Sequence, residues 1–414
     1  MENGVEIYEN QVRNEKELIK LFVMAGGKDV SDYQVIWKGP VLDASGYGIA
    51  SREYVLSLDR LGADIKIQPF TWNFPYQFND PGKKDRLLQL IDTPYKENKQ
   101  KILIYHCPPG NIEDIKKERK TCDLILLNTV WETARIPRSW LPFINACDGV
   151  CVPCSQNVYA MKKSGVKIPV FLAPHGADIQ TFNPGNKKLA LKEANGKFVF
   201  VSIFDFQHRK NPETLLKAYW SEFTSRDNVL LIIKTYGRSR KNILNAISKY
   251  KRNLGFTNGT APIHVLTGIL PEEQIKGLYT LGNAFILPTR GEGVGLPYME
   301  ALSSGTPVIA TGWGGQMDFL NEQNSFLIDY KLEDPRKSMY SDNAISKRYH
   351  HLFGQGGQLW AEADLEDTKR KMRLAYENPH LCKQKGKKGR WDMEKLTWDV
   401  AGISMKKAIE ELLK

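Results

Sequence analysis

The sequence has few of the features that direct a chain into a membrane or out of the cell. No apolar run approaches the ~18 residues of a membrane-spanning helix. The first residues, Met1-Glu2-Asn3-Gly4, lack the basic and then apolar order of a secretory signal. Only six of the 414 residues are cysteine, and disulfides are rare in the cytoplasm. We therefore expect a cytoplasmic protein.

The sequence also lacks the usual signs of a bound metal. It contains no Asp-x-Asp pair, and no second cysteine or histidine pair at zinc-finger spacing accompanies Cys151 and Cys154. Cys147, Cys151 and Cys154 do have the Cys-x3-Cys-x2-Cys spacing of an iron–sulfur cluster. However, Cys151 falls in the apolar run 149–152, which predicts a buried strand, and free cysteines pack as small apolar residues. We interpret all three as core residues.

The chain is long and carries an excess of positive charge. A chain of 414 residues is long enough for two domains. Lysine and arginine number 58 against 47 aspartates and glutamates, a net charge of +11. This excess indicates an anionic partner, such as a nucleotide, a nucleic acid or an acidic membrane surface. An ordinary basic enzyme fits the composition equally well.

Strands and helical segments alternate along the chain in two series. The strands expected in the first series are 33–37, 64–67, 101–105, 124–127 and 149–152. Those expected in the second are 198–202, 229–233, 263–266, 284–288 and 307–310. Helical spacing of apolar residues marks segments between them, such as 49–61, 213–220 and 271–281. The alternation predicts βαβ units and two mostly parallel sheets, which bind ligands at the carboxyl ends of their strands.

Three segments lie outside this alternation. A short amphipathic segment, 15–24, precedes the first strand. Residues 331–357 are rich in charge and break the pattern, so we expect a loop-rich insertion there. The last segment, 391–414, has helical periodicity and predicts a final helix.

The most informative stretch directly follows the expected strand 284–288. It reads Arg290-Gly291-Glu292-Gly293-Val294-Gly295-Leu296-Pro297-Tyr298-Met299-Glu300. Glycines let a backbone approach a ligand closely, and proline is tolerated where a helix begins. The start of that helix offers free N–H groups and a positive dipole end to an anion. The stretch therefore predicts a site for a molecule with a phosphate and several hydroxyls.

The same stretch resembles the nucleotide-sugar signature of retaining glycosyltransferases of the GT-B fold, in particular glycosyltransferase family 4 (glycosyl transferases group 1). The match consists of Glu292 and Glu300, with seven residues between them, and of the motif Glu-Gly-x-Gly-Leu-Pro that starts at Glu292. Residues 173–184 resemble the segment that joins the two domains in this family, with His175 in place of asparagine. The resemblance runs from about Trp37 to Asp364, and it is more specific in the second half.

The resemblance implies an α/β fold of GT-B type, in which two Rossmann-like domains face each other across a cleft. Residues 1–178 would form the acceptor-side domain and residues 179–394 the nucleotide-sugar donor domain. Residues 395–414 would form a helix that crosses back and packs on the first domain.

The resemblance also implies roles for the residues of the donor site. Glu292 would bind sugar hydroxyls, and Glu300 would bind the ribose. Lys210 matches the lysine that neutralises the leaving diphosphate, but the Gly-Arg pair usual before it is absent. Whether Arg209 supplies the missing guanidinium stays open.

Two cations beside a diphosphate replace a metal ion, so we expect neither a metal nor a cofactor. The other expected donor-binding residues are Gly46, Gly48, Lys234, Thr235, Ile269, Leu270, Gly293, Val294, Gly295 and Leu296.

Two places in the first half complete the expected site. His106 follows the strand 101–105 and precedes a Cys-Pro-Pro-Gly loop. We expect this histidine beside the sugar, with the catalytic set His106, Arg209, Lys210 and Glu292. The loop 39–51 nearly matches a Gly-x-Gly-x-x-Gly dinucleotide fingerprint, but Ser51 stands at the third glycine. It resembles more closely the family 4 loop that touches the donor diphosphate and the acceptor.

These observations predict a retaining glycosyltransferase that moves a sugar from a nucleoside diphosphate sugar to an acceptor hydroxyl. A catalytically inactive nucleotide-sugar-binding protein of the same fold is a second reading. An NAD-binding enzyme is a third, since Asp64 lies near the position of a ribose-binding acid.

We expect the acceptor to be a glycan, a glycoprotein or a lipid-linked sugar, and no nucleic-acid partner. Aromatic residues at 72–76 and 131–140 suit either sugar stacking or core packing. The positive charge leaves a peripheral contact with the inner membrane face open.

Overall fold

The computed structural model describes residues 32–72, 75–257, 259–341, 344–346 and 349–414. The amphipathic segment expected at 15–24 lies outside these residues. The chain divides into two compact units. The first comprises the described residues up to Trp131, then Arg135–Gly176 and Leu396–Lys414. The second comprises Glu132–Ala134 and Ala177–Lys395.

The first unit is built on a six-stranded parallel sheet with the order β2-β1-β3-β4-β5-β6. Its strands are β1 (Tyr33–Gly39), β2 (Ile65–Pro69), β3 (Gln100–His106), β4 (Leu124–Asn128), β5 (Gly149–Val152) and β6 (Val170–Leu172). The helices that accompany it are α2 (Gly46–Arg60), α3 (Pro81–Asp92), α4 (Ile115–Glu118), α5 (Leu141–Ile144), α6 (Ser155–Ser164) and α15 (Trp398–Leu412). The middle strands are almost wholly buried, as apolar runs in a parallel sheet must be.

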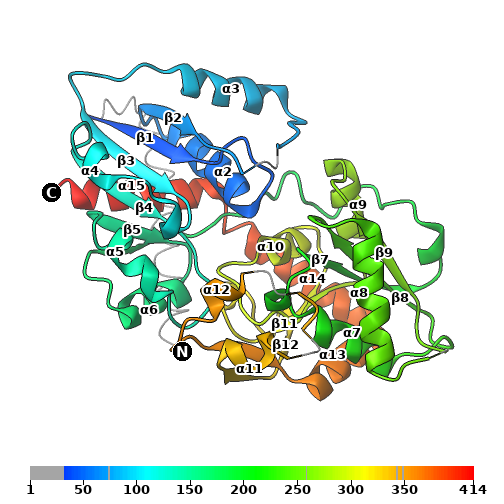
Figure 1. Ribbon diagram of the computed structural model, residues 1–414. Helices are drawn as coiled ribbons and strands as arrows, with labels where there is room; N and C mark the ends of the chain where they lie inside the picture. The colour runs from blue at the N-terminus through cyan, green and yellow to red at the C-terminus, as the bar shows by residue number, and fades with distance from the viewer. Residues whose placement is uncertain (1–31, 73–74, 258, 342–343, 347–348) are drawn as a thin grey trace. The chain divides into compact units, whose positions relative to one another are not determined.

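The second unit repeats this plan. Its sheet is also parallel, with the order β12-β11-β10-β7-β8-β9. The strands are β7 (Phe198–Ile203), β8 (Val229–Thr235), β9 (Ile263–Thr267), β10 (Ala284–Leu287), β11 (Val308–Thr311) and β12 (Ser325–Ile328). The helices are α7 (Pro212–Glu222), α8 (Arg240–Asn253), α9 (Glu272–Leu281), α10 (Leu296–Ser303), α13 (Leu365–Glu377) and α14 (Pro379–Met393). Figure 1 shows each sheet with helices on its faces. The predicted alternation of strands and helices is confirmed in both halves.

The prediction of a loop-rich insertion at 331–357 missed several short elements. Its described residues include most of β13 (Tyr330–Glu333) and the short helices α11 (Pro335–Met339) and α12 (His350–Phe353). β13 pairs antiparallel with β14 (Trp360–Ala363), which follows the segment. This strand pair was missed because β13 has only four residues, two of them charged and none of them buried, and its partner strand lies far along the chain.

The expected final helix over 391–414 is also wrong in detail. α14 ends at Met393 and α15 begins at Trp398, with the turn 394–397 between them. α15 packs on α2 and on β5, so the last helix does return to the first sheet (Figure 1). Within the described residues, no helix is both long and apolar enough to cross a membrane.

Candidate functional site

The loop between β10 and α10 has the geometry that its glycines predict. Gly295 has φ of 89°, a left-handed conformation that L side chains rarely adopt. A Cβ at this position would lie 2.5 Å from the ring of Tyr298. α10 starts at Leu296 directly afterwards, so its first N–H groups have no acceptor within the helix. The proposed amide donors Val294, Gly295 and Leu296 thus lie at a helix N-terminus.

Four charged side chains meet beside this loop and form what we call the charge cluster: Glu132, Arg209, Lys210 and Glu292. Lys210 Nζ lies 2.6 Å from Glu292 Oε1, and Arg209 Nη1 lies 3.4 Å from Glu292 Oε2. Arg209 Nη2 also lies 3.2 Å from Glu132 Oε1. Three residues that the sequence assigns to the donor site are therefore in direct contact.

In the charge cluster, burial and ion pairing shift the pKa of a side chain in opposite directions. Burial alone would raise the pKa of Glu292, but Lys210 and Arg209 hold it below its usual value. Burial raises the pKa of Glu132 despite Arg209, and Glu292 adds to this rise. Burial also lowers the pKa of Lys210, against the pull of Glu292. Glu292 is therefore the carboxylate that the two cations keep ionised.

Glu132 was not expected in the donor site, because it lies between β4 and β5, within the first series of strands. Residues Glu132–Ala134 nevertheless belong to the second unit. Ala134 N donates to Leu359 O at 2.9 Å, and Thr133 Oγ1 donates to Gln358 Oε1 at 2.7 Å. Gly291 passes so close that a Cβ would lie 2.1 Å from Glu132 O. Only a glycine at 291 leaves room for this contact.

Glu300 is paired with a residue that the sequence analysis did not single out. Tyr279, on α9, donates its hydroxyl to Glu300 Oε2 at 2.6 Å. Burial raises the pKa of Glu300 to about 7, although the Tyr279 hydroxyl works in the opposite direction. A carboxyl with this pKa changes its charge near neutral pH, which is uncommon for glutamate.

The expected residues at the ends of β8 and β9 lie at the same edge of the sheet, since these strands are neighbours. Lys234 is buried, and burial lowers its pKa to about 8. Thr235 Oγ1 is buried without a hydrogen-bond partner among the described residues. Ile269 is 66% exposed, and Leu270 is half-buried. A buried hydroxyl without a partner is uncommon in folded proteins, so this edge is suited to a polar ligand.

His106 lies in the first unit, at the carboxyl end of β3. Its Nδ1 is 2.7 Å from Ser51 Oγ, which also accepts a hydrogen bond from Trp37 Nε1 at 3.0 Å. Burial holds the pKa of His106 well below its usual value, so the ring is neutral. Ser51 is thus the residue that orients His106, which explains why it stands where a dinucleotide fingerprint has glycine.

The two glycines expected in the first-unit loop differ in their surroundings. A Cβ at Gly48 would lie 2.0 Å from Asp43 O, so only glycine fits there. A Cβ at Gly46 would meet nothing within 4 Å. The donor-binding role of both glycines stays a prediction, as does the role of His106.

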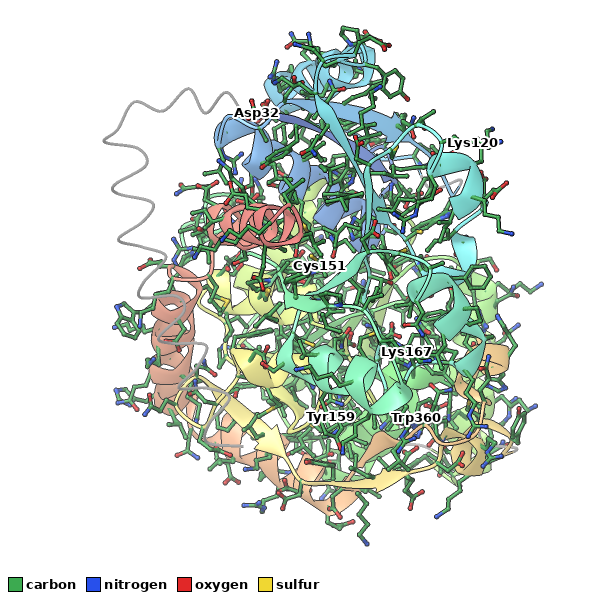
Figure 2. The ribbon with its side chains drawn as sticks, turned by 90° about the vertical axis from the view of Figure 1, so that its left-hand side faces the viewer. Asp32, Lys120, Cys151, Tyr159, Lys167 and Trp360 are labelled. Carbon is green, nitrogen blue, oxygen red and sulfur yellow. The ribbon has the colours of Figure 1, made fainter. Side chains whose placement is uncertain are left out.

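The three cysteines at cluster spacing occupy places in the core of the first unit. Cys151 lies on β5 and is fully buried (Figure 2). Cys147 is buried just before β5. Cys154 caps α6, because its Sγ accepts a hydrogen bond from Asn157 N. Burial raises the pKa of Cys147 to about 12, so it is a thiol at neutral pH. Among the described residues, no group of three His, Cys, Asp or Glu could hold a metal ion.

The aromatic residues for which the sequence allows either sugar stacking or core packing divide into two groups. Trp131 and Trp140 are buried and pack edge to face, with ring centroids 4.6 Å apart. They are core residues of the first unit. Trp72 is half-buried against Tyr47, with centroids 5.6 Å apart. Residues 73–74 of the range 72–76 lie outside the described residues.

Two parallel six-stranded sheets, with the last helix on the first, define the GT-B class of glycosyltransferase folds. Solved structures with this fold superpose over nearly the whole chain. Sucrose-phosphate synthase from Thermosynechococcus elongatus matches with a TM-score of 0.62 and 15% identity, covering 92% of this chain and 99% of its own. HepE from Anabaena, solved with UDP and glucose, matches with a TM-score of 0.59 and 11% identity, covering 92% and 100%. The predicted GT-B fold is confirmed.

Residues 195–337 match the family model described as Glycosyl transferases group 1. The alpha-monoglucosyldiacylglycerol synthase of Streptococcus pneumoniae is 27% identical over 178 residues, which are 41% of this chain and 38% of that protein. The GDP-mannose-dependent alpha-mannosyltransferase of Corynebacterium glutamicum is 24% identical over 192 residues, 46% and 43% of the two chains. The chain thus matches less than half of the length of these curated relatives.

Proposed function

We propose that this protein is a retaining glycosyltransferase that uses a nucleoside diphosphate sugar. The observation that carries the proposal is the charge cluster, which joins Arg209 and Lys210 to Glu292 at the start of α10. Two cations, a carboxylate and free helix N–H groups are what a diphosphate and a sugar need side by side. The group 1 family match covers these same loops.

The proposed reaction breaks the bond between the anomeric carbon and the diphosphate oxygen. The acceptor oxygen forms its new bond to that carbon on the same face of the sugar. The acceptor proton passes to the leaving phosphate oxygen, so no enzyme nucleophile is needed. Lys210 and Arg209 would stabilise the charge that develops on the diphosphate. Glu292 would hold sugar hydroxyls and Glu300 the ribose.

His106 would contact the sugar at the reaction centre. Its Nδ1 is occupied by Ser51, which leaves Nε2 as the atom for a sugar hydroxyl. Since the ring is neutral, it would act as a hydrogen-bonding group and not as a permanent charge. His106→Ala should therefore lower kcat by roughly 10- to 1,000-fold with less effect on nucleotide binding. Unchanged turnover in this variant would assign His106 a structural role.

We propose a sugar-bearing acceptor, either a glycan, a glycosylated protein or a lipid-linked sugar. Tyr47 and Trp72 support a sugar because both rings remain partly exposed. Of the two curated relatives described above, one is named for a diacylglycerol glycolipid, so a lipid acceptor is the alternative that needs a test. Sedimentation with anionic vesicles provides it. Salt-sensitive binding would favour a lipid-linked acceptor, and no binding at low salt would favour a soluble one.

The NAD-binding alternative finds little support in the first unit. Asp64, which would bind the ribose in that reading, accepts from Gln34 Nε2 at 3.1 Å and pairs with Lys99 at 3.0 Å. One experiment addresses all the alternatives. The protein is incubated with UDP-, GDP-, ADP-, CDP- and dTDP-sugars, and release of the nucleoside diphosphate is measured with and without candidate acceptors. NAD serves as a binding control.

Acceptor-dependent release with any of these donors supports the proposal, and NMR of the product then shows whether the anomeric configuration is kept. Binding of a nucleotide sugar without release or transfer would favour the inactive binding protein. Binding of NAD alone would overturn both readings.

A further inference from the structure

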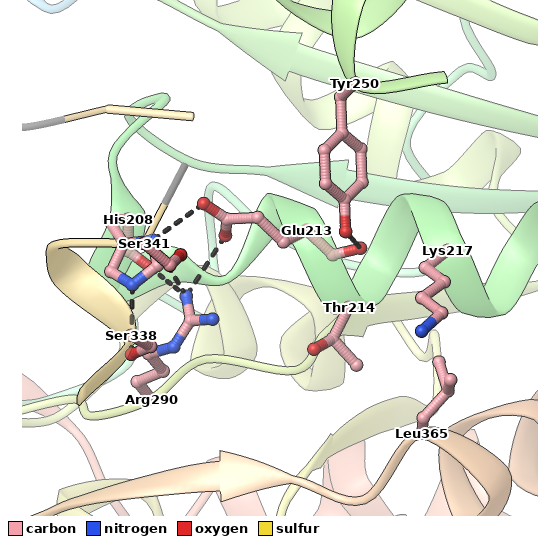
Figure 3. Close-up of a pocket in the computed structure, with 9 residues that line it drawn as sticks. All are labelled: His208, Glu213, Thr214, Lys217, Tyr250, Arg290, Ser338, Ser341 and Leu365. Carbon is pink, nitrogen blue, oxygen red and sulfur yellow. Dashed lines mark hydrogen bonds and ion pairs between the residues drawn. The ribbon is translucent and has the colours of Figure 1, made fainter. Parts of the chain in front are cut away.

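A second polar cavity lies in the second unit, beside the first turns of α7 (Figure 3). Its volume is about 230 Å³. It is lined by His208, Glu213, Thr214, Lys217, Tyr250, Arg290, Ser338, Ser341 and Leu365. None of these is among the residues assigned above to sugar or nucleotide, although His208 and Arg290 are sequence neighbours of the charge cluster.

Arg290 is the central residue of this cavity, and it is only 4% exposed. Its Nε donates to Glu362 Oε1 at 2.7 Å, and its Nη1 donates to Glu213 Oε2 at 3.1 Å and to the carbonyl of His208. The second terminal nitrogen, Nη2, has no hydrogen-bond partner among the described residues. In Figure 3 it points from the paired side of the guanidinium toward Thr214. A guanidinium N–H that faces the cavity without a protein acceptor can donate to an acceptor atom of a ligand.

Further donors surround this free nitrogen. Lys217, on α7, forms no ion pair or hydrogen bond with the described residues, and its ammonium group lies in the cavity wall opposite Arg290 (Figure 3). Thr214 contributes its hydroxyl from the first turn of the same helix. That turn is the positive end of an 11-residue helix. Guanidinium, ammonium and hydroxyl donors together fit the oxygens of a small oxyanion.

The acids of the cavity are already engaged. Glu213 Oε1 accepts from Ile345 N at 2.9 Å and lies 2.7 Å from His208 Nδ1, while Oε2 is paired with Arg290. Burial alone would raise the pKa of Glu213, but Arg290 and His208 lower it to about 2. Glu213 is therefore ionised and compensated, and it does not leave a free negative charge facing the cavity.

His208 links the two acids of this region. Its Nδ1 lies 2.7 Å from Glu213 Oε1 and 3.4 Å from Arg290 Nη1. Its Nε2 lies 3.1 Å from Ser338 Oγ, whose hydroxyl donates to Glu362 Oε1 at 2.7 Å. Both ring nitrogens are therefore engaged by the cavity wall, and Arg290 and Lys217 are the cations available to an anion.

We propose that this cavity binds a phosphoryl group, either as inorganic phosphate or as a phosphate ester of a sugar. Arg290 Nη2, Lys217 Nζ and the Thr214 hydroxyl are its donors. The side chains of Tyr250 and Leu365, which also line the cavity, could contact the carbon atoms of an ester. Nothing in this proposal requires the protein to transfer a sugar.

The cavity is also connected to the charge cluster, and this second part rests on the proposed function. Arg290 N donates to Arg209 O at 2.8 Å, and the Thr289 hydroxyl lies 3.1 Å from the carbonyl oxygens of both Arg209 and Gly291. A phosphoryl group that pulls on the Arg290 side chain therefore acts on the backbone that carries Arg209 and Glu292. Phosphate and nucleoside diphosphate should change each other's affinity by the same factor.

Calorimetric titration of the full chain with inorganic phosphate and with a hexose 6-phosphate tests the proposal. The titrations use the Lys210→Met background, because Lys210 in the donor site could itself bind phosphate. We expect one saturable site whose affinity falls at least about tenfold in Lys217→Met and in Thr214→Val, since each removes one donor. Lys249→Met is the matched control, because Lys249 is an exposed lysine on α8, the helix that carries Tyr250.

Tighter binding of the hexose phosphate would identify an ester as the ligand, and equal binding would identify the free ion. Absence of saturable binding, or affinity unchanged by both cavity variants, would overturn the proposal. Repeating the titration in the wild-type protein with nucleoside diphosphate tests the coupling. If the protein binds no nucleotide, the proposed function fails while the phosphate result stands, so the two failures are distinguishable.

Discussion

Glu292 is held by two cations, and this pairing links the proposed sugar-binding and phosphate-binding roles. A diphosphate that enters the site would compete with Glu292 for Lys210 and Arg209. The carboxylate released in this way could turn to the sugar hydroxyls. The pairing thus keeps buried cations compensated until a ligand replaces the carboxylate, as buried charges require.

Substitution of Lys210 and substitution of Glu292 should therefore have opposite effects on nucleotide binding. Lys210→Met removes a phosphate contact and should raise the Kd for a nucleoside diphosphate by about 10- to 100-fold. Glu292→Gln frees the same cation and should leave that Kd unchanged or lower it, while kcat falls by at least about tenfold. Calorimetry and steady-state kinetics measure the two quantities. If Glu292→Gln weakened nucleotide binding as much as Lys210→Met, the competition described here would be wrong.

The pKa of about 7 for Glu300 makes stability depend on pH. A carboxyl whose pKa is higher in the folded than in the unfolded chain stabilises the fold below the unfolded value, here 4.5. That contribution is lost as the pH rises through the folded value. Between pH 5 and 8 the wild type should lose about 1–3 kcal/mol of unfolding free energy relative to Glu300→Gln. Chemical denaturation at both pH values gives the difference.

The same variant tests the role of Glu300 in nucleotide binding. An ionised carboxylate accepts stronger hydrogen bonds from ribose hydroxyls than a neutral amide does. Nucleotide affinity should therefore rise from pH 6 to pH 8 more steeply in the wild type than in Glu300→Gln. Parallel pH profiles for the two proteins would remove Glu300 from the nucleotide site.

Several of these residues could be predicted from the sequence, and others could not. Glu292, Glu300 and Lys210 each follow a buried strand in the sequence, which predicts that they lie at the carboxyl edge of one sheet. The structure brings Glu292 and Lys210 into contact. Glu132 and Tyr279 reach the site from distant segments, and only tertiary packing reveals their proximity. Ser51 was visible only as a departure from a glycine pattern, and its contact with His106 gives the reason.

At the scale of elements, the strands were predictable because buried parallel strands are continuous apolar runs. The antiparallel pair of β13 and β14 was missed because β13 is short, carries charge and has no buried residue. The break between α14 and α15 was missed because apolar residues continue at helical spacing across the turn. Leu396, in that turn, is itself buried. Periodicity alone does not distinguish one long helix from two short ones.

The packing of α15 on α2 depends on a close contact between Gly402 and Ser57. A Cβ at Gly402 would lie 2.1 Å from Ser57 Oγ and 2.7 Å from Ser57 Cβ. Gly402→Ala should therefore destabilise the protein by about 1–3 kcal/mol through overpacking. Ser57→Gly should restore part of this loss in the double variant. Gly46→Ala, at the start of α2 where a Cβ meets nothing, is the control and should be nearly neutral.

Thermal and denaturant unfolding of the four proteins measure these effects. Equal stability of Gly402→Ala and the wild type would show that α15 can shift away from α2 without cost.

At the scale of the whole molecule, the proposed function predicts stabilisation by ligand without a metal. The matching nucleoside diphosphate should stabilise the folded protein by on the order of 2–3 kcal/mol at a hundredfold excess over its Kd. EDTA should not remove this effect, because Arg209 and Lys210 supply the positive charge. Thermal shift with and without EDTA measures it. Strict dependence on magnesium or manganese would show that the two cations are insufficient.

The return of α15 to the first unit has a consequence for how the chain is made. Domains generally fold during synthesis, beginning with the one nearest the N-terminus. The first unit also contains Leu396–Lys414, and this segment is synthesised only after the whole of Ala177–Lys395. Until then the face of α2 that packs on α15 has no partner. The unit that is translated first is therefore the last to have all of its elements.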